Sequence, residues 1–209
     1  MSALRDIARR RTVSLIHGAP GSMQSHVAHE IAFRCARAGL RVVVIDDQPV
    51  LDHLITWRNA RKVQTGERLR LEHIDDRDLE KSRDLGAALL AELNLRHFVP
   101  DVVVSTRLAT DPGGLTGRLG SPYLSMGADV FNALGSGVLF AAHTGPAPGS
   151  EIEAPPYFEL WKCVAGINLS VTLSGPRGEV ISIRGREHGG SGLRTSIVFE
   201  DPKELSHAL

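Results

Sequence analysis

Apolar and polar positions follow two alternating periodicities through the first 145 residues or so. Short apolar runs rich in β-branched residues predict strands at 12–16, 41–45, 101–104 and 138–141. Between these runs, apolar residues recur every three or four positions, which predicts helices at 25–38, 50–60, 78–95 and 123–134. Asp78 is the expected N-cap of the third helix. Because continuous apolar strands alternate with helices, the pattern predicts an α/β fold, with a mostly parallel sheet covered on both faces.

The pattern changes toward the C-terminus. Segments 166–173 and 179–184 flank a Gly-Pro-Arg-Gly turn at 175–178, which predicts a β-hairpin, and 195–199 predicts one more strand. The sheet is therefore expected to end in antiparallel strands. We expect a single domain over 1–209, with a basic segment at 1–11, a core at 12–200 and a tail at 201–209.

Charge and composition exclude several classes. The 209 residues carry 24 Lys+Arg and 24 Asp+Glu, so bulk positive charge for nucleic-acid binding is absent. The four arginines between Arg5 and Arg11 leave only a local basic patch, which predicts at most weak nucleic-acid binding. Two cysteines make no disulfide framework, and no apolar run is long enough to cross a bilayer. The expected location is therefore the cytoplasm, away from membranes.

The segment from His17 to Ser25 lies between the first strand and the first helix, where a phosphate-binding loop would be found. The working pattern is Gly-x-x-x-x-Gly-Lys-Ser/Thr, in which backbone amides hold phosphates, the Lys reaches the outer phosphates and the hydroxyl binds magnesium. Gly18 and Ser25 fit this pattern, whereas Met23 replaces the second Gly and Gln24 replaces the Lys. The residues that would contact a nucleotide are Gly18, Gly21, Ser22, Gln24 and Ser25.

Both replacements have physical consequences. The second Gly often adopts a backbone torsion that only Gly favours, and Met adds bulk there. Losing one charge-assisted hydrogen bond to a phosphate costs roughly 1.5–3 kcal/mol of binding. The simpler interpretation is a tight Gly-Pro-Gly turn from strand to helix without a ligand.

In this order of segments, the chain resembles the RecA-fold ATPases of the plasmid-replication RepA type, relatives of the DnaB hexameric helicases and the KaiC-like proteins. The resemblance covers about residues 10–200, so it implies a RecA-like P-loop NTPase core. It rests on 12–25 as the Walker A strand and loop, 41–49 as the next strand, 100–109 as the Walker B strand, 137–145 as the sensor strand and 183–189 as a late basic strand end.

The resemblance also implies roles for individual residues. The catalytic carboxylate of the family falls on Asp47, and a γ-phosphate sensor falls on His143. Asp47 can equally be a helix N-cap, and His143 a hydrogen-bonded residue at a strand end. The magnesium-linked Asp of Walker B falls on Ser105, and Ala142 replaces a family His.

A second group of residues concerns assembly. Arg184 and Arg186 match basic residues that reach the nucleotide of a neighbouring subunit, and their spacing places them on one strand face. A solvated face explains the same spacing. The loop 144–160 corresponds to the DNA-holding loop of ring helicases, yet it carries Glu151, Glu153 and Glu159 and no Lys or Arg. Helicase action is therefore not expected.

The departures from the family motifs all weaken one site. We expect a catalytically degraded RecA-like module that self-assembles or binds a partner, linked to DNA replication, repair or a mobile element. No cofactor is firmly expected: ATP with magnesium would bind weakly, and Ser25 would be a metal ligand only in that complex. The alternatives are a genuine ATPase or helicase-like protein with an atypical P-loop, and an accessory paralogue that docks on an active RecA-type ATPase.

Two further patterns receive structural interpretations. His26 and His29 lie on one helix face without a complete ligand set, so surface histidines are expected rather than a metal site. The run 74–84 has mixed charge and is expected to be a solvated helix start.

Overall fold

The computed structural model describes residues 13–19, 23–46, 71–110, 120–143, 167–174, 180–187 and 193–198. Its helices are α2 (Gln24–Arg37), α4 (Asp76–Leu79), α5 (Leu85–Leu95), α6 (Arg107–Thr110) and α7 (Gly120–Leu134). Its strands are β1 (Val13–Gly18), β2 (Val42–Asp46), β3 (Leu71–Asp75), β4 (Val102–Ser105), β5 (Gly137–His143), β6 (Ile167–Ser174), β7 (Val180–Glu187) and β8 (Leu193–Val198).

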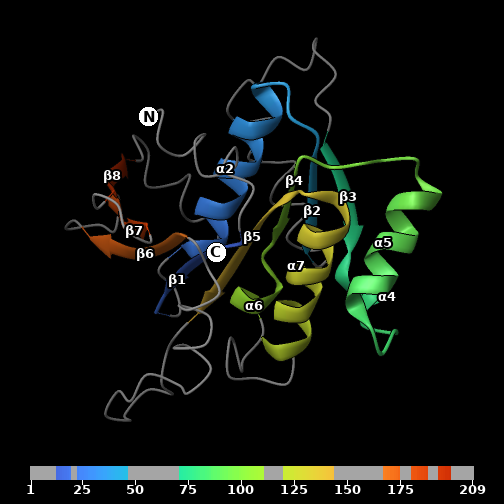
Figure 1. Ribbon diagram of the computed structural model, residues 1–209. Helices are drawn as coiled ribbons and strands as arrows, with labels where there is room; N and C mark the ends of the chain where they lie inside the picture. The colour runs from blue at the N-terminus through green and yellow to red at the C-terminus, as the bar shows by residue number, and fades with distance from the viewer. Residues whose placement is uncertain are drawn as a thin grey trace.

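In the described residues these strands form one sheet in the order β3-β2-β4-β5-β1-β6-β7-β8. All pairs from β3 to β6 are parallel, and β7 and β8 extend the sheet as antiparallel strands. The order is non-sequential because β4 and β5 lie between β1 and β2. Helix α2 must therefore cross over two strands to connect β1 with β2, as Figure 1 shows.

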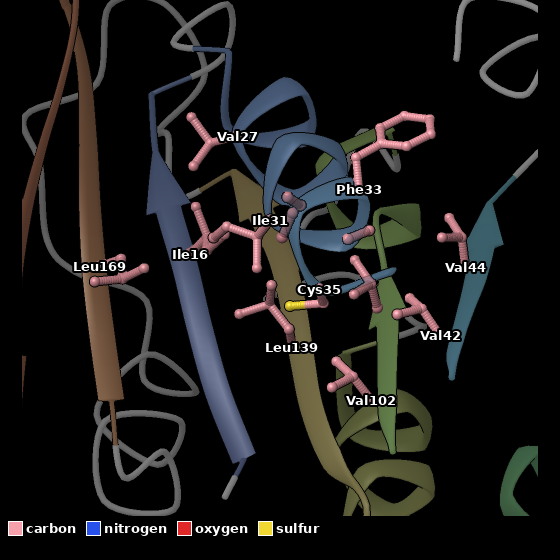
Figure 2. Close-up of a cluster of buried hydrophobic side chains, with 14 of the residues drawn as sticks. Ile16, Val27, Ile31, Phe33, Cys35, Val42, Val44, Val102, Leu139 and Leu169 are labelled. Atoms are coloured by element: carbon pink, nitrogen blue, oxygen red, sulfur yellow. The ribbon is translucent and has the colours of Figure 1, made fainter. Parts of the chain in front are cut away.

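Each face of the parallel sheet is covered by helices, so its strands are apolar on both sides. On one face, α2 packs with Val27, Ile31 and Cys35 against the even-numbered positions of β2 and β4, as Figure 2 shows. On the other face, α4, α5, α6 and α7 cover the odd-numbered positions of the same strands. Residue parity along each strand therefore indicates which helix layer a side chain faces.

The predicted α/β class and the C-terminal antiparallel strands are confirmed, with the turn 175–178 outside the described residues. The predicted helix 50–60 also lies outside them. The prediction of one helix over 78–95 is wrong, because two helices occupy that range and the chain turns between them at 80–84. Asp75 and Asp84, rather than Asp78, accept hydrogen bonds as N-caps.

Strand β3 was not predicted, because Leu71–Asp75 mixes charged and apolar residues. Such a mixture is tolerated at the edge of a sheet, where β3 lies. None of the helices in the described ranges is both long and apolar enough to span a bilayer.

Candidate functional site

The carboxyl ends of the parallel strands meet at one edge of the sheet. Gly18 ends β1 beside His143 at the end of β5, while Ser105 ends β4 beside Ile45 of β2. Open α/β sheets bind ligands at this edge, where strand order reverses and the loops of neighbouring strands diverge. The predicted nucleotide-binding loop therefore starts at the edge where this fold places a ligand.

Helix α2 begins with a left-handed residue. Met23 has φ 67° and ψ 24°, a conformation that costs a non-glycine residue about 1–2 kcal/mol. The Met23 side chain is only 7 % exposed and packs in the core under α2. The backbone thus adopts the torsion expected of the missing Gly, and burial of the Met side chain compensates for it.

The next position is equally enclosed. Gln24 is the first residue of α2 and is 4 % exposed, and Ser25 behind it is half-buried. The first turn of α2 carries no acidic side chain, so the partial positive charge of this helix end is not neutralised there. The place of the family's lysine is taken by a buried, uncharged amide.

Two hydroxyls occur at the end of β4. Ser105 and Thr106 are both fully buried, and among the described residues neither Ser105 Oγ nor Thr106 Oγ1 has a hydrogen-bond partner. The Thr106 amide donates to Ile45 O at 3.1 Å, so the strand ladder continues through Thr106. By parity with Val104, Thr106 is on the α2 face, whereas Ser105 is on the α7 face with Val103. Strand parity therefore puts Thr106, not Ser105, on the face of the sheet that α2 covers.

A buried carboxylate ends β2. Asp46 is fully buried, with one oxygen 3.1 Å from His29 Nε2 of α2 and the other 2.6 Å from His73 Nε2 of β3. Burial raises the pKa of Asp46, but the two imidazole hydrogen bonds outweigh it, so the pKa lies below its ordinary value of 3.8.

This Asp46–His29–His73 cluster ties α2 to the end of β2 and to the middle of β3. The prediction that His29 is a surface histidine is wrong, because its ring is buried against Asp46. Sequence reasoning missed the cluster, although one signal was present: Asp46 ends an otherwise apolar strand. His29 lies on the apolar face of its helix, between Ala28 and Ile31, where a buried polar group needs a partner.

Two further described acidic groups near this edge, Asp75 and Asp76, are also paired. The Arg77 guanidinium lowers the pKa of Asp75 to about 2. Asp76 is fully buried and forms an ion pair with Arg107, which also bonds Glu80. Burial lowers the pKa of Arg107, but the carboxylates of Glu80 and Asp76 outweigh this effect, so the pKa lies above its ordinary value. The prediction that 74–84 is simply solvated is therefore wrong at Asp76 and at buried Ile74.

A magnesium ion would need uncommitted oxygen ligands at this edge. Among the described residues, Asp46, Asp75 and Asp76 are each engaged by a histidine or an arginine. No group of three or more His, Cys, Asp or Glu in that part of the chain is arranged to hold a metal. The described carboxylates at this edge are therefore already engaged and are not free to bind a divalent ion.

Several predicted site residues are described only in part. Gly21, Ser22 and Asp47 lie outside the described residues, as do the loop 144–160 and the arginines of 1–11. For His143, Arg184 and Arg186 the structure describes the backbone alone. Arg184 pairs with Ser170 of β6 and Arg186 with Asn168, so both lie two strands away from β1.

Comparison with known proteins identifies a solved structure with a similar fold. No protein-family model matches the chain, and no curated protein sequence does. A solved structure that does match is the flagellar accessory protein FlaH from Methanocaldococcus jannaschii, with 14 % identity and a TM-score of 0.55 over 85 % of this chain and 77 % of that one. At this identity the likeness concerns the fold alone. Together with the strand order, it defines the chain as an α/β protein with a RecA-like core, the class predicted from the sequence.

Proposed function

We propose that the chain is a RecA-like P-loop module without efficient ATP hydrolysis, which works by assembling with copies of itself or with a partner protein. The observation that carries the proposal is the first turn of α2, where a buried neutral Gln24 replaces the lysine. Phosphoryl transfer depends on electrostatic stabilisation of developing charge, which an amide supplies poorly.

The end of β4 supports the same proposal. Neither Ser105 nor Thr106 carries the negative charge that helps to organise magnesium in an active site of this fold. Since a neutral side chain occupies both the lysine position and the Walker B position, a single compensating neighbour would not restore both.

The biological setting is a finer part of the proposal. The resemblance to RepA-type and DnaB-type ATPases favours a role in DNA replication, repair or a mobile element. A homo-oligomer or a mixed assembly with an active RecA-type ATPase fits such a role, and direct DNA contact would be weak. The competing function is a genuine ATPase whose missing cation comes from a neighbouring subunit.

Steady-state turnover of the purified full chain with magnesium and ATP tests the proposal. We expect turnover far below ~1 s⁻¹, the low end of ordinary enzymes. The matched variants are Ser25→Ala in the loop and Ser125→Ala on the exposed face of α7. Turnover near ~1 s⁻¹ that Ser25→Ala abolishes and Ser125→Ala leaves intact would establish the competing ATPase function.

A further inference from the structure

Strand β6 has one face in the core and a different character on the other. Leu169 and Val171 are buried in the cluster beneath α2, whereas Ser170 between them is half-buried and Thr172 is exposed. Successive side chains of a strand point to opposite faces of the sheet. The polar residues of β6 therefore share the face of the sheet that lies away from α2.

The antiparallel register extends this polar face across β7 and β8, which lie with β6 on the side of the sheet away from α4, α5 and α7 (Figure 1). Ser170 pairs with Arg184, and Arg184 pairs in turn with Arg194. Arg186 pairs with Asn168. Because directly paired residues share a face, all three arginines are placed on the polar face of β6. We call this surface the basic face and define it by Arg184, Arg186, Arg194, Asn168, Ser170 and Thr172.

Two of these arginines are directly opposite each other. Arg184 of β7 pairs with Arg194 of β8, and like charges in such a cross-strand pair repel each other and destabilise the sheet. Glu187 is the one acidic residue in the described parts of β6, β7 and β8, and its pairing with Ile167 places it on the other face. The counter-charge for the arginines therefore has to come from outside these three strands, which indicates an anionic ligand.

The spacing of the arginines favours a ligand with several phosphates. Arg184 and Arg186 are two residues apart on β7, which is about 7 Å along a strand, and Arg194 lies across from the first of them. Small ligands bind in concave pockets, whereas this face extends over three strands. Hydroxyl and amide side chains, which surround the arginines here, commonly contact phosphate and sugar oxygens of nucleic acids.

The same strands offer nothing that reads bases. The described parts of β6, β7 and β8 contain no Phe, Tyr or Trp, so the basic face provides no platform on which unpaired bases could stack. Contacts between arginines and phosphates carry no sequence information. The chemistry therefore favours the backbone of a duplex over an unpaired strand or a particular sequence.

From these observations we propose that the basic face binds the phosphate backbone of duplex DNA, with Arg184, Arg186 and Arg194 each neutralising phosphate charge. The inference deepens the proposed function and rests on it for the DNA setting. It differs from contact with a neighbouring subunit's nucleotide, because Arg194 takes part and the ligand is a polymer. The contact is with a face of the sheet, so the free edge of β8 stays available for assembly.

Fluorescence anisotropy of the full chain with two unrelated duplex DNA sequences of equal length tests the proposal. We expect equal affinities for both, and the three arginines should contribute about −2.7 to the slope of log affinity against log salt, since each neutralised phosphate contributes about −0.9. Absence of binding at about 50 mM salt, or a preference above about tenfold for one sequence, would overturn the proposal.

Arg194→Ser and Arg83→Ser form the matched pair. Each removes one positive charge, the first from the basic face and the second from the exposed turn between α4 and α5. Arg194→Ser should weaken binding about fivefold to tenfold at about 0.1 M salt and make the salt slope shallower by about 0.9. Arg194→Lys, which keeps the charge, should restore most of the affinity, and Arg83→Ser should change neither quantity. Equal losses from the two Ser variants, or no loss from Arg194→Ser, would overturn the proposal.

Thermal unfolding without DNA gives a second readout. Arg194→Ser relieves a like-charge repulsion and should leave the thermal midpoint unchanged or raise it, while Arg194→Glu should raise it by forming an opposite-charge pair with Arg184. Arg194→Glu should also abolish DNA binding. A lowered midpoint in both variants would mean that Arg194 is already paired with an acidic group of the chain itself and would overturn the proposal.

Light scattering of the same samples separates DNA contact from assembly. Arg194→Ser should have the same mass as the wild type, and a loss of affinity only in samples that have also dissociated would overturn the proposal. Weakened ATP binding of Arg194→Ser with unchanged DNA binding would also overturn it, in favour of a neighbouring subunit's nucleotide.

The outcomes distinguish this inference from the proposed function. If the chain neither binds DNA nor hydrolyses ATP, the inference fails while a non-catalytic assembly module stands. If DNA binds through the basic face and ATP turnover reaches about 1 s⁻¹, the inference stands while the proposed function fails.

Discussion

At the scale of single residues, the carboxyl edge holds an unusual concentration of buried polar groups. Asp46, Asp76, Ser105 and Thr106 are each 0 % exposed. The two carboxylates are engaged by His29, His73 and Arg107, whereas the two hydroxyls have no hydrogen-bond partner in the part of the chain that the structure describes. Pairing makes the buried charges tolerable, since an isolated buried carboxylate would be protonated instead.

Replacing Asp46 by Asn should destabilise the fold by about 1–3 kcal/mol, because the buried imidazole of His29 and the partly buried imidazole of His73 lose their charged acceptor. The pKa of Asp46 is lower in the folded state than its ordinary value of 3.8. Its contribution is therefore fully present above that value and is lost as pH falls through the folded-state pKa. Urea unfolding at pH 7 and pH 3 measures both effects.

The expected result is a large difference between wild type and Asp46→Asn at pH 7 that shrinks at pH 3. Asp78→Asn is the control, because Asp78 is an exposed residue that forms an ion pair with the exposed Lys81. A difference that stays constant with pH would show that Asp46 acts through packing rather than charge.

At the scale of elements, close packing of α7 on the sheet depends on one glycine. A Cβ atom at Gly127 would lie 2.6 Å from the ring of Phe140 in β5. That ring is fully buried and packs edge-on against Tyr123 with centroids 6.4 Å apart. Since the ring is fully buried and held against Tyr123, either the ring or α7 would have to shift to admit a methyl group.

Gly127→Ala should therefore cost about 1–3 kcal/mol, the usual penalty for overpacking, even though Ala favours helix. The double variant Gly127→Ala/Phe140→Leu should recover part of the loss, because a smaller side chain leaves room for the methyl group. Denaturant midpoints of the wild type, both single variants and the double variant form a cycle. Strictly additive effects would contradict direct contact.

At the scale of the whole molecule, the absence of net charge bears on assembly. With 24 basic and 24 acidic residues, copies of the chain repel one another little. Among the described residues, β8 pairs only with β7, so one of its edges carries backbone groups without a strand partner. Both features favour association through the side of the sheet that carries Arg184 and Arg186.

Light scattering of the wild-type chain should therefore detect a species larger than the 22.6 kDa monomer. The double variant Arg184→Ser/Arg186→Ser should shift the population toward monomer, while Arg77→Ser, at the opposite side of the sheet, should not. A monomer at all concentrations would exclude self-association and leave a different partner protein as the assembly mode.

The sequence alone determined the layers of this protein. The apolar strands ending at Ile45 and Val104, and the three-to-four spacing of Val27, Ile31 and Cys35, predict the elements that the structure contains, because burial on both faces requires continuous apolar runs. Local chemistry also indicated that position 23 would need a glycine-like torsion, and Met23 adopts it. These features depend on neighbours in the chain, so periodicity and motif spacing reveal them.

Only the tertiary structure decided which polar groups meet. His29 and His73 are 44 residues apart in sequence, and both reach Asp46 because β3 pairs with β2 while α2 packs on β2. Strand parity puts Thr106 on the same face as Val104 and Ser105 on the opposite face. Aligning the motif one residue too early exchanges these two faces. Contacts between distant segments depend on sheet order and register, and neither is encoded in any single segment of the chain.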